Sequence, residues 1–296
     1  MEFAFSQEQD ELRREARSYL ESNADAPLAD LRELGWLGVS VPEERGGGGL
    51  SFVDEAILFE EAGRALYTGP FLTTAIVLPA LAHVDDNAWS VELDGLVPHL
   101  DVVDKVLRED MTTVAAEGES LETMDETRPL GRLAKNDGDS VDGDFEPVRL
   151  RLLAALALEA VGVAQKALEL GVEYVSAREQ FGKKIGTYQA VSHPLADTYV
   201  ETELARSLAY WAAWCVAQES EQHGEQAPVA VVVAAAKALA AETAVAACER
   251  SIQVHGGIGF TWEHVLHRYY KRAQWIDAFG GHAAKQREVV AAHLLD

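Results

Sequence analysis

Basic residues are scarce in this sequence. Only 25 Lys and Arg stand against 49 Asp and Glu among 296 residues, which gives a formal net charge of -24. A nucleic-acid-binding surface needs clustered Lys and Arg to neutralise phosphates, so this composition argues against that class of function. The acidic excess is typical of a soluble protein. An anionic ligand would therefore have to be held by a few local cations.

Cysteine is rarer still. Cys215 and Cys248 lie far apart in alanine-rich segments with helical character. Their separation fits neither a metal site nor a redox motif, so we expect two buried free thiols in a reducing compartment. Residues 1–20 are acidic and amphipathic, without a basic stretch before an apolar run, and no segment shows the uninterrupted apolar length of a membrane span. These absences predict a soluble cytoplasmic protein without a membrane role.

Residues 1–83 are predicted to form an N-terminal helical domain. Ser6, followed by an acidic first turn, is a candidate N-cap, and further helices are expected over about 52–66 and 73–82. A run of four glycines at 46–49 lacks the Lys-Ser/Thr pair of a phosphate loop and the spaced glycines of a dinucleotide fingerprint. We therefore expect a flexible connection there.

The rest of the chain divides into two regions. Residues 84–145 are rich in Asp, Gly and Val, and predict short strands separated by turns, enough for a small sheet. Residues 146–296 return to long alanine- and leucine-rich helices and predict an antiparallel four-helix bundle with a tail helix. The fold class is mainly α, with a reduced middle β segment. The expected bundle helices span residues 150–176, 188–218, 229–254 and 262–279.

A cationic cluster of Arg178, Lys183 and Lys184 follows the first bundle helix. The simplest account is a favourable interaction with the helix C-terminus, which needs no ligand. The same loop, however, carries glycines, whose backbone amides can approach phosphates, and the aromatic ring of Phe181. An Arg guanidinium suits a pyrophosphate, and a Phe ring offers a surface for adenine or ribose. From the residues alone, both interpretations stay open.

A second polar and glycine-rich segment, QVHGGIGF, begins at Gln253 between two predicted helices. Gly256 and Gly257 are explained by a helix C-cap and a turn. That explanation leaves out Gln253, whose amide lies one turn before the break. A helix end with an amide beside close-approach glycines would suit ribityl or phosphate oxygens.

These two segments resemble the C-terminal signatures of the acyl-CoA dehydrogenase family. The resemblance extends to FSQEQDELRREARSYL and LGWLGVSVPEERGG, which are similar to that family's first helices. LETMDETRPLGRL, around Asp125 and Arg128, resembles the end of its middle β domain. The resemblance thus covers nearly the whole chain and is most specific in the two C-terminal signatures.

The resemblance implies FAD as cofactor, shared between two subunits. The isoalloxazine lies in one subunit, between the β domain and the C-terminal helices, and the adenosine diphosphate end reaches a neighbouring subunit. In that family, residues of the neighbouring subunit contact this end of FAD, and the matching motif positions in this sequence are the expected cofactor-binding residues. These positions are Arg178, Phe181, Gln189, Gln253, Gly256 and Gly257.

The family's catalytic base is missing from its expected place. The usual Glu, just before the last helix, corresponds to Gly280, and the alternative position on the first C-terminal helix corresponds to Leu152. Neither residue can abstract a proton. Asp277 and His282 lie nearby in sequence and are the carboxylate and imidazole candidates for a substitute base, but we expect both to face solvent or to cap the helix. No catalytic residue is therefore assigned to this chain.

The first half of the family's middle domain, with its flavin-side Thr-Glu-x-x-x-Gly-Ser-Asp-like segment, is also missing. Together the two losses predict a non-catalytic subunit of an α2β2 heterotetrameric acyl-CoA dehydrogenase, whose homologous partner supplies the base and most of the acyl pocket. Assemblies of this kind imply fatty acid or steroid side-chain β-oxidation, with a bulky or steroid side-chain CoA ester as substrate and an electron-transfer flavoprotein as a candidate acceptor. A homo-oligomeric flavoenzyme with a non-standard base and a non-enzymatic scaffold subunit are the alternatives.

Overall fold

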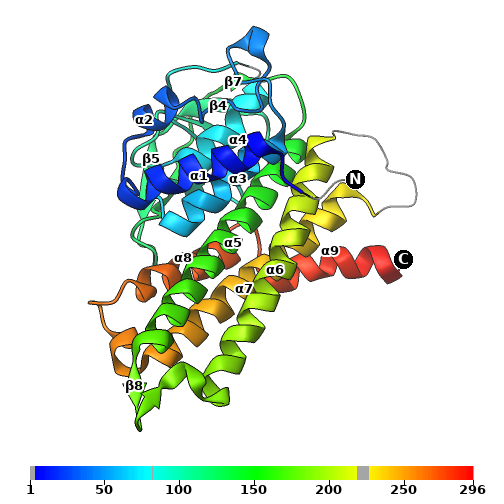
Figure 1. The fold of residues 1–296 in the computed structure, drawn as a ribbon. Helices are drawn as coiled ribbons and strands as arrows, with labels where there is room; N and C mark the ends of the chain where they lie inside the picture. The colour runs from blue at the N-terminus through cyan, green and yellow to red at the C-terminus, as the bar shows by residue number, and fades with distance from the viewer. Residues whose placement is uncertain (1–3, 82, 219–226, 296) are drawn as a thin grey trace.

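The computed structural model describes residues 4–81, 83–218 and 227–295. The fold is mainly α, with short strands in its middle part, as the sequence predicts. Figure 1 shows the N-terminal helices, in blue and cyan, above a bundle of long helices. The N-terminal elements are α1 (Gln7–Ser22), α2 (Leu28–Glu33), η1 (Glu43–Arg45), α3 (Phe52–Ala65) and α4 (Phe71–Leu81).

Two N-terminal helices begin with reciprocal side-chain caps. The Ser6 hydroxyl accepts a hydrogen bond from the Gln9 backbone N–H (3.2 Å), and the Gln9 side chain accepts one from the Ser6 N–H (3.0 Å). Ser51 and Asp54 form the same motif at the start of α3. Each motif satisfies backbone donors that a helix start otherwise leaves unpaired. The predicted N-cap at Ser6 is confirmed.

The middle part forms two small sheets, with strand orders β1-β3-β4-β7 and β2-β6-β5. β1 and β3 pair in parallel, and the other strand pairs in these two sheets are antiparallel. Short strands and tight turns agree with the prediction from composition. The strands are β1 (Trp89–Val91), β2 (Val97–Pro98), β3 (Lys105–Leu107), β4 (Thr112–Ala115), β5 (Gly118–Leu121), β6 (Leu130–Leu133) and β7 (Asp139–Ser140).

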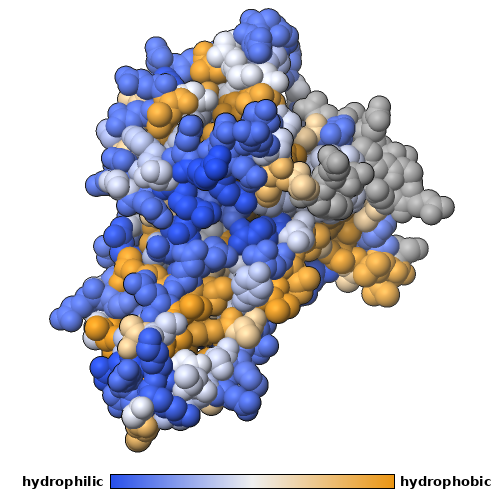
Figure 2. Space-filling model, viewed as in Figure 1, coloured by the Kyte–Doolittle hydropathy of each residue, from blue (hydrophilic) through white to orange (hydrophobic). Residues whose placement is uncertain are grey.

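The C-terminal part is a bundle of long helices with a tail helix. α5 lies at its centre and also packs against α3, so one core joins the N-terminal helices to the bundle. Figure 2 shows apolar surface along the bundle. The elements are α5 (Phe145–Ala177), β8 (Glu179–Gln180), β9 (Lys183–Lys184), η2 (Ile185–Thr187), α6 (Gln189–Ala217), α7 (Val229–His255), η3 (Gly256–Phe260), α8 (Leu266–Ala278) and α9 (Ala283–Leu295).

Helix α7 corrects one expectation about composition. The segment Val229–Phe260 is long and apolar enough to cross a membrane, contrary to the prediction that no segment has this character. Its apolar window is 56% buried within the described chain, and α7 packs against α5, α6, α8 and α9. A core helix of this kind passes the same test of length and composition. The sequence analysis missed this apolar character because Lys237 interrupts the alanine-rich run.

A buried cluster of charges fixes the middle part onto the bundle. The guanidinium of Arg272, on α8, donates to Asp125 Oδ2 (2.6 Å) and to Glu159 Oε1 (2.7 Å). Arg128 also donates to the Glu159 carboxylate, and all four side chains are buried. The cluster therefore joins the loop after β5 to both α5 and α8. Charged side chains are stable at such a buried position only when neighbouring opposite charges compensate them.

Candidate functional site

A tight hairpin follows α5 and presents an aromatic ring to solvent. β8 and β9 pair antiparallel, and the two residues between them, Phe181 and Gly182, have φ angles of +53° and +79°. Positive φ at both central residues is the signature of a type I′ hairpin turn. The left-handed conformation is costly for a Phe, and Phe181 is 93% exposed. An exposed aromatic ring held in a strained turn points to contact with another molecule.

Three cations lie around this hairpin. Arg178 ends α5 with its backbone N–H bonded to the Tyr174 carbonyl (2.9 Å), and its side chain is exposed. Within the described ranges, no residue pairs with the Arg178 guanidinium. Lys183 and Lys184 are also exposed, and the Lys183 ammonium lies 4.1 Å from the Tyr188 ring centroid. This is a local positive site in a strongly acidic chain.

Helix α6 begins at Gln189, directly after the hairpin. Its N-cap, Tyr188, provides no side-chain hydrogen bond to the first turn, and no described group accepts from the backbone N–H of Gln189 or Ala190. The Gln189 side chain is exposed, and no described residue hydrogen-bonds to its amide. The start of α6 therefore offers both backbone and side-chain donors, which suits an anionic or polar ligand.

The second predicted segment ends α7. Gln253 is exposed in the last turn, and Gly256 ends the helix with φ of +63°. A methyl group added at Gly256 or Gly257 would meet no atom within 4 Å, so the chain itself does not use the space beside these glycines. At Gly259, in contrast, the methyl would lie 2.6 Å from the Ile252 carbonyl oxygen. Only Gly259 is explained by packing within the chain.

The structure brings the two segments to the same end of the bundle. The rings of Tyr174, near the end of α5, and His255, at the end of α7, stack with centroids 4.3 Å apart and an interplanar angle of 27°. Val175, Leu195 and Val254 form an apolar cluster beneath them. Figure 1 shows the β8 hairpin and the end of α7 side by side at the lower tip of the molecule.

Two exposed aromatic residues in this region were missed by sequence reasoning. Phe260 and Trp262 follow the glycine segment, and each is 74% exposed. The Lys271 ammonium lies 4.5 Å from the Trp262 ring centroid. The sequence gives no periodicity in this loop that would separate exposed aromatics from buried ones.

The residues at this tip fit the adenosine diphosphate end of FAD. A pyrophosphate needs cationic and N–H donors, and among the described residues the Arg178 guanidinium and the first N–H groups of α6 have no partner. An adenine needs an aromatic or apolar surface, which the exposed Phe181 ring provides. Open glycines permit a close approach of ligand atoms. The chemistry of these donors and the vacant space beside Gly256 and Gly257 therefore agree with the expected cofactor.

The position of the missing base lies at the opposite side of the core and is closed. Gly280 has φ of +74°, and a methyl group added there would lie 2.7 Å from Leu153 Cδ2 and 3.4 Å from Leu93 Cδ2. The Gln286 side chain also donates to the Gly280 carbonyl (2.8 Å). A side chain pointing inward at position 280 would displace leucines of α5 and of the middle part. Position 280 therefore offers no base, and aliphatic side chains take the space into which a side chain there would extend.

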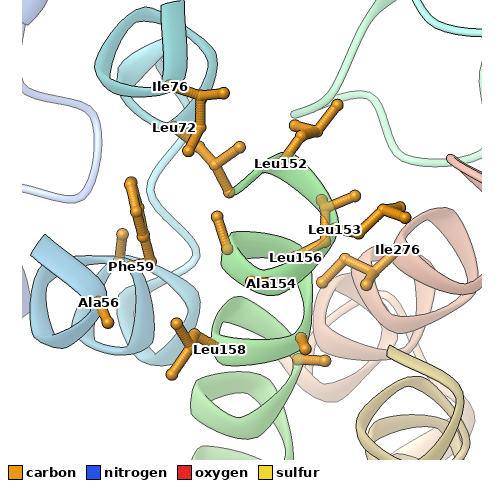
Figure 3. Packing of buried hydrophobic residues seen from close by; sticks show 14 of the residues in the cluster. Ala56, Phe59, Leu72, Ile76, Leu152, Leu153, Ala154, Leu156, Leu158 and Ile276 are labelled. Atoms are coloured by element: carbon orange, nitrogen blue, oxygen red, sulfur yellow. The ribbon is translucent and has the colours of Figure 1, made fainter. Parts of the chain in front are cut away.

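The alternative base position is equally apolar. Leu152 has no exposed surface. Figure 3 shows Leu152 in α5 near Leu72 and Ile76 of α4, and shows Leu153 and Leu156 on the side of Ile276 in α8. Aliphatic side chains thus fill the region between α4, α5 and α8.

Asp277 and His282 are used at the junction of α8 and α9. Asp277 Oδ1 accepts the Ala283 backbone N–H (3.1 Å), and Asp277 Oδ2 lies 2.9 Å from His282 Nδ1. The Asp277 carboxylate therefore caps the start of α9, one of the two roles expected for Asp277 and His282. The ammonium of the buried Lys237 donates to the Ile276 carbonyl (2.6 Å) and so caps the end of α8.

Comparison with known proteins identifies the relationship. Residues 6–84 match the model of the acyl-CoA dehydrogenase N-terminal domain, and residues 151–295 match that of the acyl-CoA dehydrogenase C-terminal domain. The chain is 34% identical over 261 residues to acyl-CoA dehydrogenase IpdE2 of Mycobacterium tuberculosis, covering 81% of this chain and 77% of that protein. It is 36% identical to acyl-CoA dehydrogenase FadE34 of the same organism over 92% of this chain, but spans only 43% of FadE34.

Solved structures have the same fold. The ChsE4–ChsE5 complex from Mycobacterium tuberculosis matches with a TM-score of 0.86 at 22% identity, covering 100% of this chain and 99% of the matched chain. A Tcur3481–Tcur3483 steroid acyl-CoA dehydrogenase variant matches with a TM-score of 0.82 at 24% identity, covering 97% and 98%. The domain matches and the IpdE2 alignment show that this chain belongs to the acyl-CoA dehydrogenase family, a family of FAD-dependent oxidoreductases.

Proposed function

We propose that this chain is a subunit of a heteromeric acyl-CoA dehydrogenase and contributes the adenosine diphosphate half of a shared FAD site. A homologous partner subunit, in an α2β2 assembly, supplies the flavin-ring site, the catalytic base and most of the acyl pocket. The reaction is α,β-dehydrogenation of an acyl-CoA thioester. In it, FAD accepts the hydride while a base removes the α-proton.

The observation that carries this proposal is the contrast between the two ends of the candidate site. At the tip of the bundle, Arg178 and Phe181 are exposed and have no partner among the described residues. At the base position, Gly280 is packed against Leu153. A chain with an open cofactor-tail surface and a closed reaction centre is suited to complete a neighbour's site.

Each residue at the tip has a stated role in this proposal. Arg178 would hold the pyrophosphate as a charge-assisted donor, and Phe181 would cover the adenine. Gln189 and Gln253 would donate amide hydrogen bonds to phosphate or ribityl oxygens. Gly256 and Gly257 would allow these oxygens to approach the backbone, because neither has a neighbouring atom in the space a side chain would take.

The geometry weighs against the homo-oligomeric alternative with Asp277 as base, because the Asp277 carboxylate is already engaged by Ala283 and His282. The names of the ChsE4–ChsE5 complex and the Tcur3481–Tcur3483 steroid enzyme indicate which assembly and substrates to test first. We therefore propose a bulky or steroid side-chain CoA ester as substrate, with an electron-transfer flavoprotein as acceptor. A cytoplasmic location remains part of the proposal.

Co-expression of this chain with a candidate flavin-bearing homologue tests the proposal. Size exclusion with light scattering should give the mass of an α2β2 complex, and acyl-CoA dehydrogenase turnover should disappear when the partner's base is replaced. Turnover that survives loss of the partner's base would contradict the assignment of roles. A non-enzymatic scaffold predicts instead that Arg178→Ala changes neither the flavin content nor the activity of the complex.

A further inference from the structure

Three rings from separate parts of the chain meet at the tip of the bundle. Tyr174 lies near the end of α5, His255 is the last residue of α7, and His264 lies in the loop before α8. The His255 ring stacks on Tyr174, and its centroid lies 4.4 Å from that of the His264 ring, at an interplanar angle of 55°. We call these three residues the ring cluster. It joins elements that are far apart in the sequence.

Backbone hydrogen bonds fix the orientation of both imidazoles. His255 Nδ1 lies 2.7 Å from the Ser251 carbonyl oxygen, which can only accept, so Nδ1 carries the proton and donates. The Leu266 N–H donates to His264 Nδ1 (3.3 Å), so this nitrogen is unprotonated. Each imidazole is therefore anchored to the backbone of its own segment, and the contacts between the rings join one segment to another.

The helices α5 and α7 approach each other closely one turn before the ring cluster. A methyl group added at Gly171 of α5 would lie 3.0 Å from the Ser251 hydroxyl oxygen of α7. Tyr174 follows Gly171 by three residues and His255 follows Ser251 by four, so each ring lies on the face of its helix that makes this approach. The glycine at position 171 thus lets the two helices come near enough for the rings to stack.

Each half of the candidate cofactor site begins beside one ring of the cluster. The Arg178 N–H donates to the Tyr174 carbonyl oxygen (2.9 Å), so the cationic hairpin begins one turn after Tyr174. Gly256 and Gly257 directly follow His255, and a methyl group on either would meet no atom within 4 Å. Packing around these two glycines does not fix them, and the adjacent His255 ring is where this segment meets α5.

The ring cluster is placed to hold these segments and not to touch a ligand itself. His255 is 4% exposed and Tyr174 is half-buried, whereas Arg178 and Phe181 are exposed. The Tyr174 hydroxyl has no hydrogen-bond partner among the described residues. The fold therefore uses the Tyr174 ring but not its oxygen, and loss of the ring should differ in effect from loss of the hydroxyl.

We infer that Tyr174 and His255 are positioning residues for the cofactor tail. Their stack, with His264 against it, sets where the Arg178 hairpin lies relative to the segment of Gly256, so that both segments meet one pyrophosphate. This inference rests on the proposed function and deepens it, because it names residues that act through the ligand-binding segments and do not touch the ligand.

The first test titrates FAD into the apo-complex of this chain with a candidate flavin-bearing homologue. Tyr174→Leu removes the ring, and Tyr174→Phe keeps the ring without the hydroxyl. We expect Tyr174→Leu to weaken FAD binding by roughly 2- to 12-fold, the factor that corresponds to the free energy of an aromatic pair. Tyr174→Phe should bind FAD as wild type does.

Tyr19→Leu is the matched control. Tyr19 is also half-buried and pairs with the Trp36 ring, with centroids 5.6 Å apart, in the N-terminal helices. Its loss removes an aromatic pair away from the tip of the bundle (Figure 1), so the FAD affinity of this variant should equal that of wild type.

Hydrogen exchange of the isolated chain provides a readout that needs neither FAD nor a partner. We expect Tyr174→Leu to speed amide exchange both in the hairpin, residues 178–184, and at residues 256–260, because the stack joins these segments. Tyr174→Phe should keep wild-type exchange in both. The melting temperature of each variant controls for a general loss of stability.

The outcomes separate this inference from the proposed function. Unchanged FAD affinity of Tyr174→Leu, or unchanged exchange at residues 256–260, would overturn the inference and leave the proposed function intact. Equal weakening by Tyr174→Phe would also overturn it, because the hydroxyl would then contact the cofactor directly. The same loss in Tyr19→Leu would trace the effect to general stability and overturn it too. Failure of the wild-type complex to bind FAD would overturn the proposed function and this inference together.

Discussion

Gly280 lies directly against Leu153, so that a methyl group on the glycine would come within 2.7 Å of the Leu153 Cδ2 atom. The residue at the family's base position is therefore built into the aliphatic packing between α5 and the α8–α9 junction. Position 280 lacks the carboxylate, and Leu153 packs into the space that the glycine leaves, which agrees with a chain that does not complete the reaction alone.

Gly280→Ala should destabilise the chain for two reasons, a left-handed backbone and an overpacked core. Gly95 has a nearly equal φ of +73° but no atom within 4 Å, so Gly95→Ala measures the backbone cost alone, about 1–2 kcal/mol. Overpacking should add about 1–3 kcal/mol at Gly280. Urea unfolding of both variants checks this difference. Equal losses of stability would mean that the Leu153 contact is not restrictive.

Arg178→Ala should lower FAD occupancy of the complex without destabilising this chain. The side chain is exposed and lacks a described partner, and a charge-assisted contact to a pyrophosphate contributes about 1.5–3 kcal/mol. This corresponds to a loss of FAD affinity of roughly 10- to 150-fold. Titration of FAD into the apo-complex measures it. Arg132→Ala, at another exposed arginine, is the control, and a loss of similar size there would remove the assignment.

Arg272→Met should be among the most destabilising changes in the chain. It removes a buried cation that faces Asp125 and Glu159, and breaking a buried pair from one side costs about 3–5 kcal/mol. Arg287→Met breaks a surface pair with Glu242 and should cost less than about 1 kcal/mol. Chemical denaturation of the two variants gives both values. A small loss for Arg272→Met would show that the charges do not hold the middle part to the bundle.

Lys237 should make stability depend on pH. Burial lowers the pKa of Lys237 from its ordinary value of 10.5 to about 8. Between these values the unfolded chain binds more protons, so the free energy of unfolding rises with pH through this window and falls as pH drops towards about 8. The stability difference between wild type and Lys237→Met should thus shift in favour of wild type from about pH 8 to about pH 10.

Urea unfolding across that range measures the shift, and Lys166→Met, on the half-buried surface of α5, is the control. Other titrating groups affect wild type and variant alike, so their contribution cancels in the stability difference. A difference that stays constant with pH would mean that the Lys237 ammonium is not desolvated.

Local sequence patterns predicted much of this structure. Amphipathic and alanine-rich spacing located the long helices, and the expected ends at residues 176 and 254 lie one residue from the observed ends. The start of α5 was placed five residues late, because the Asp144 side chain caps the helix at the Glu146 N–H. Helix α2 was not foreseen, since its six residues are too few to show a period.

Features that depend on distant residues could not be predicted in this way. Arg272 and Glu159 are separated by 113 residues, and nothing in either segment indicates that they pair. The sequence revealed the absence of a carboxylate at position 280, but not that Leu93 and Leu153 close the space. The cofactor-tail residues were proposed from motifs, and the structure adds that Phe181 is exposed in a left-handed turn.

The most direct test of the central claim is the ratio of bound flavin to protein in the purified, isolated chain, measured by absorbance. The account predicts a nearly colourless protein that acquires FAD only in complex with its homologous partner, at one FAD per pair of unlike chains. Stoichiometric FAD together with acyl-CoA dehydrogenase turnover in the isolated chain would contradict it.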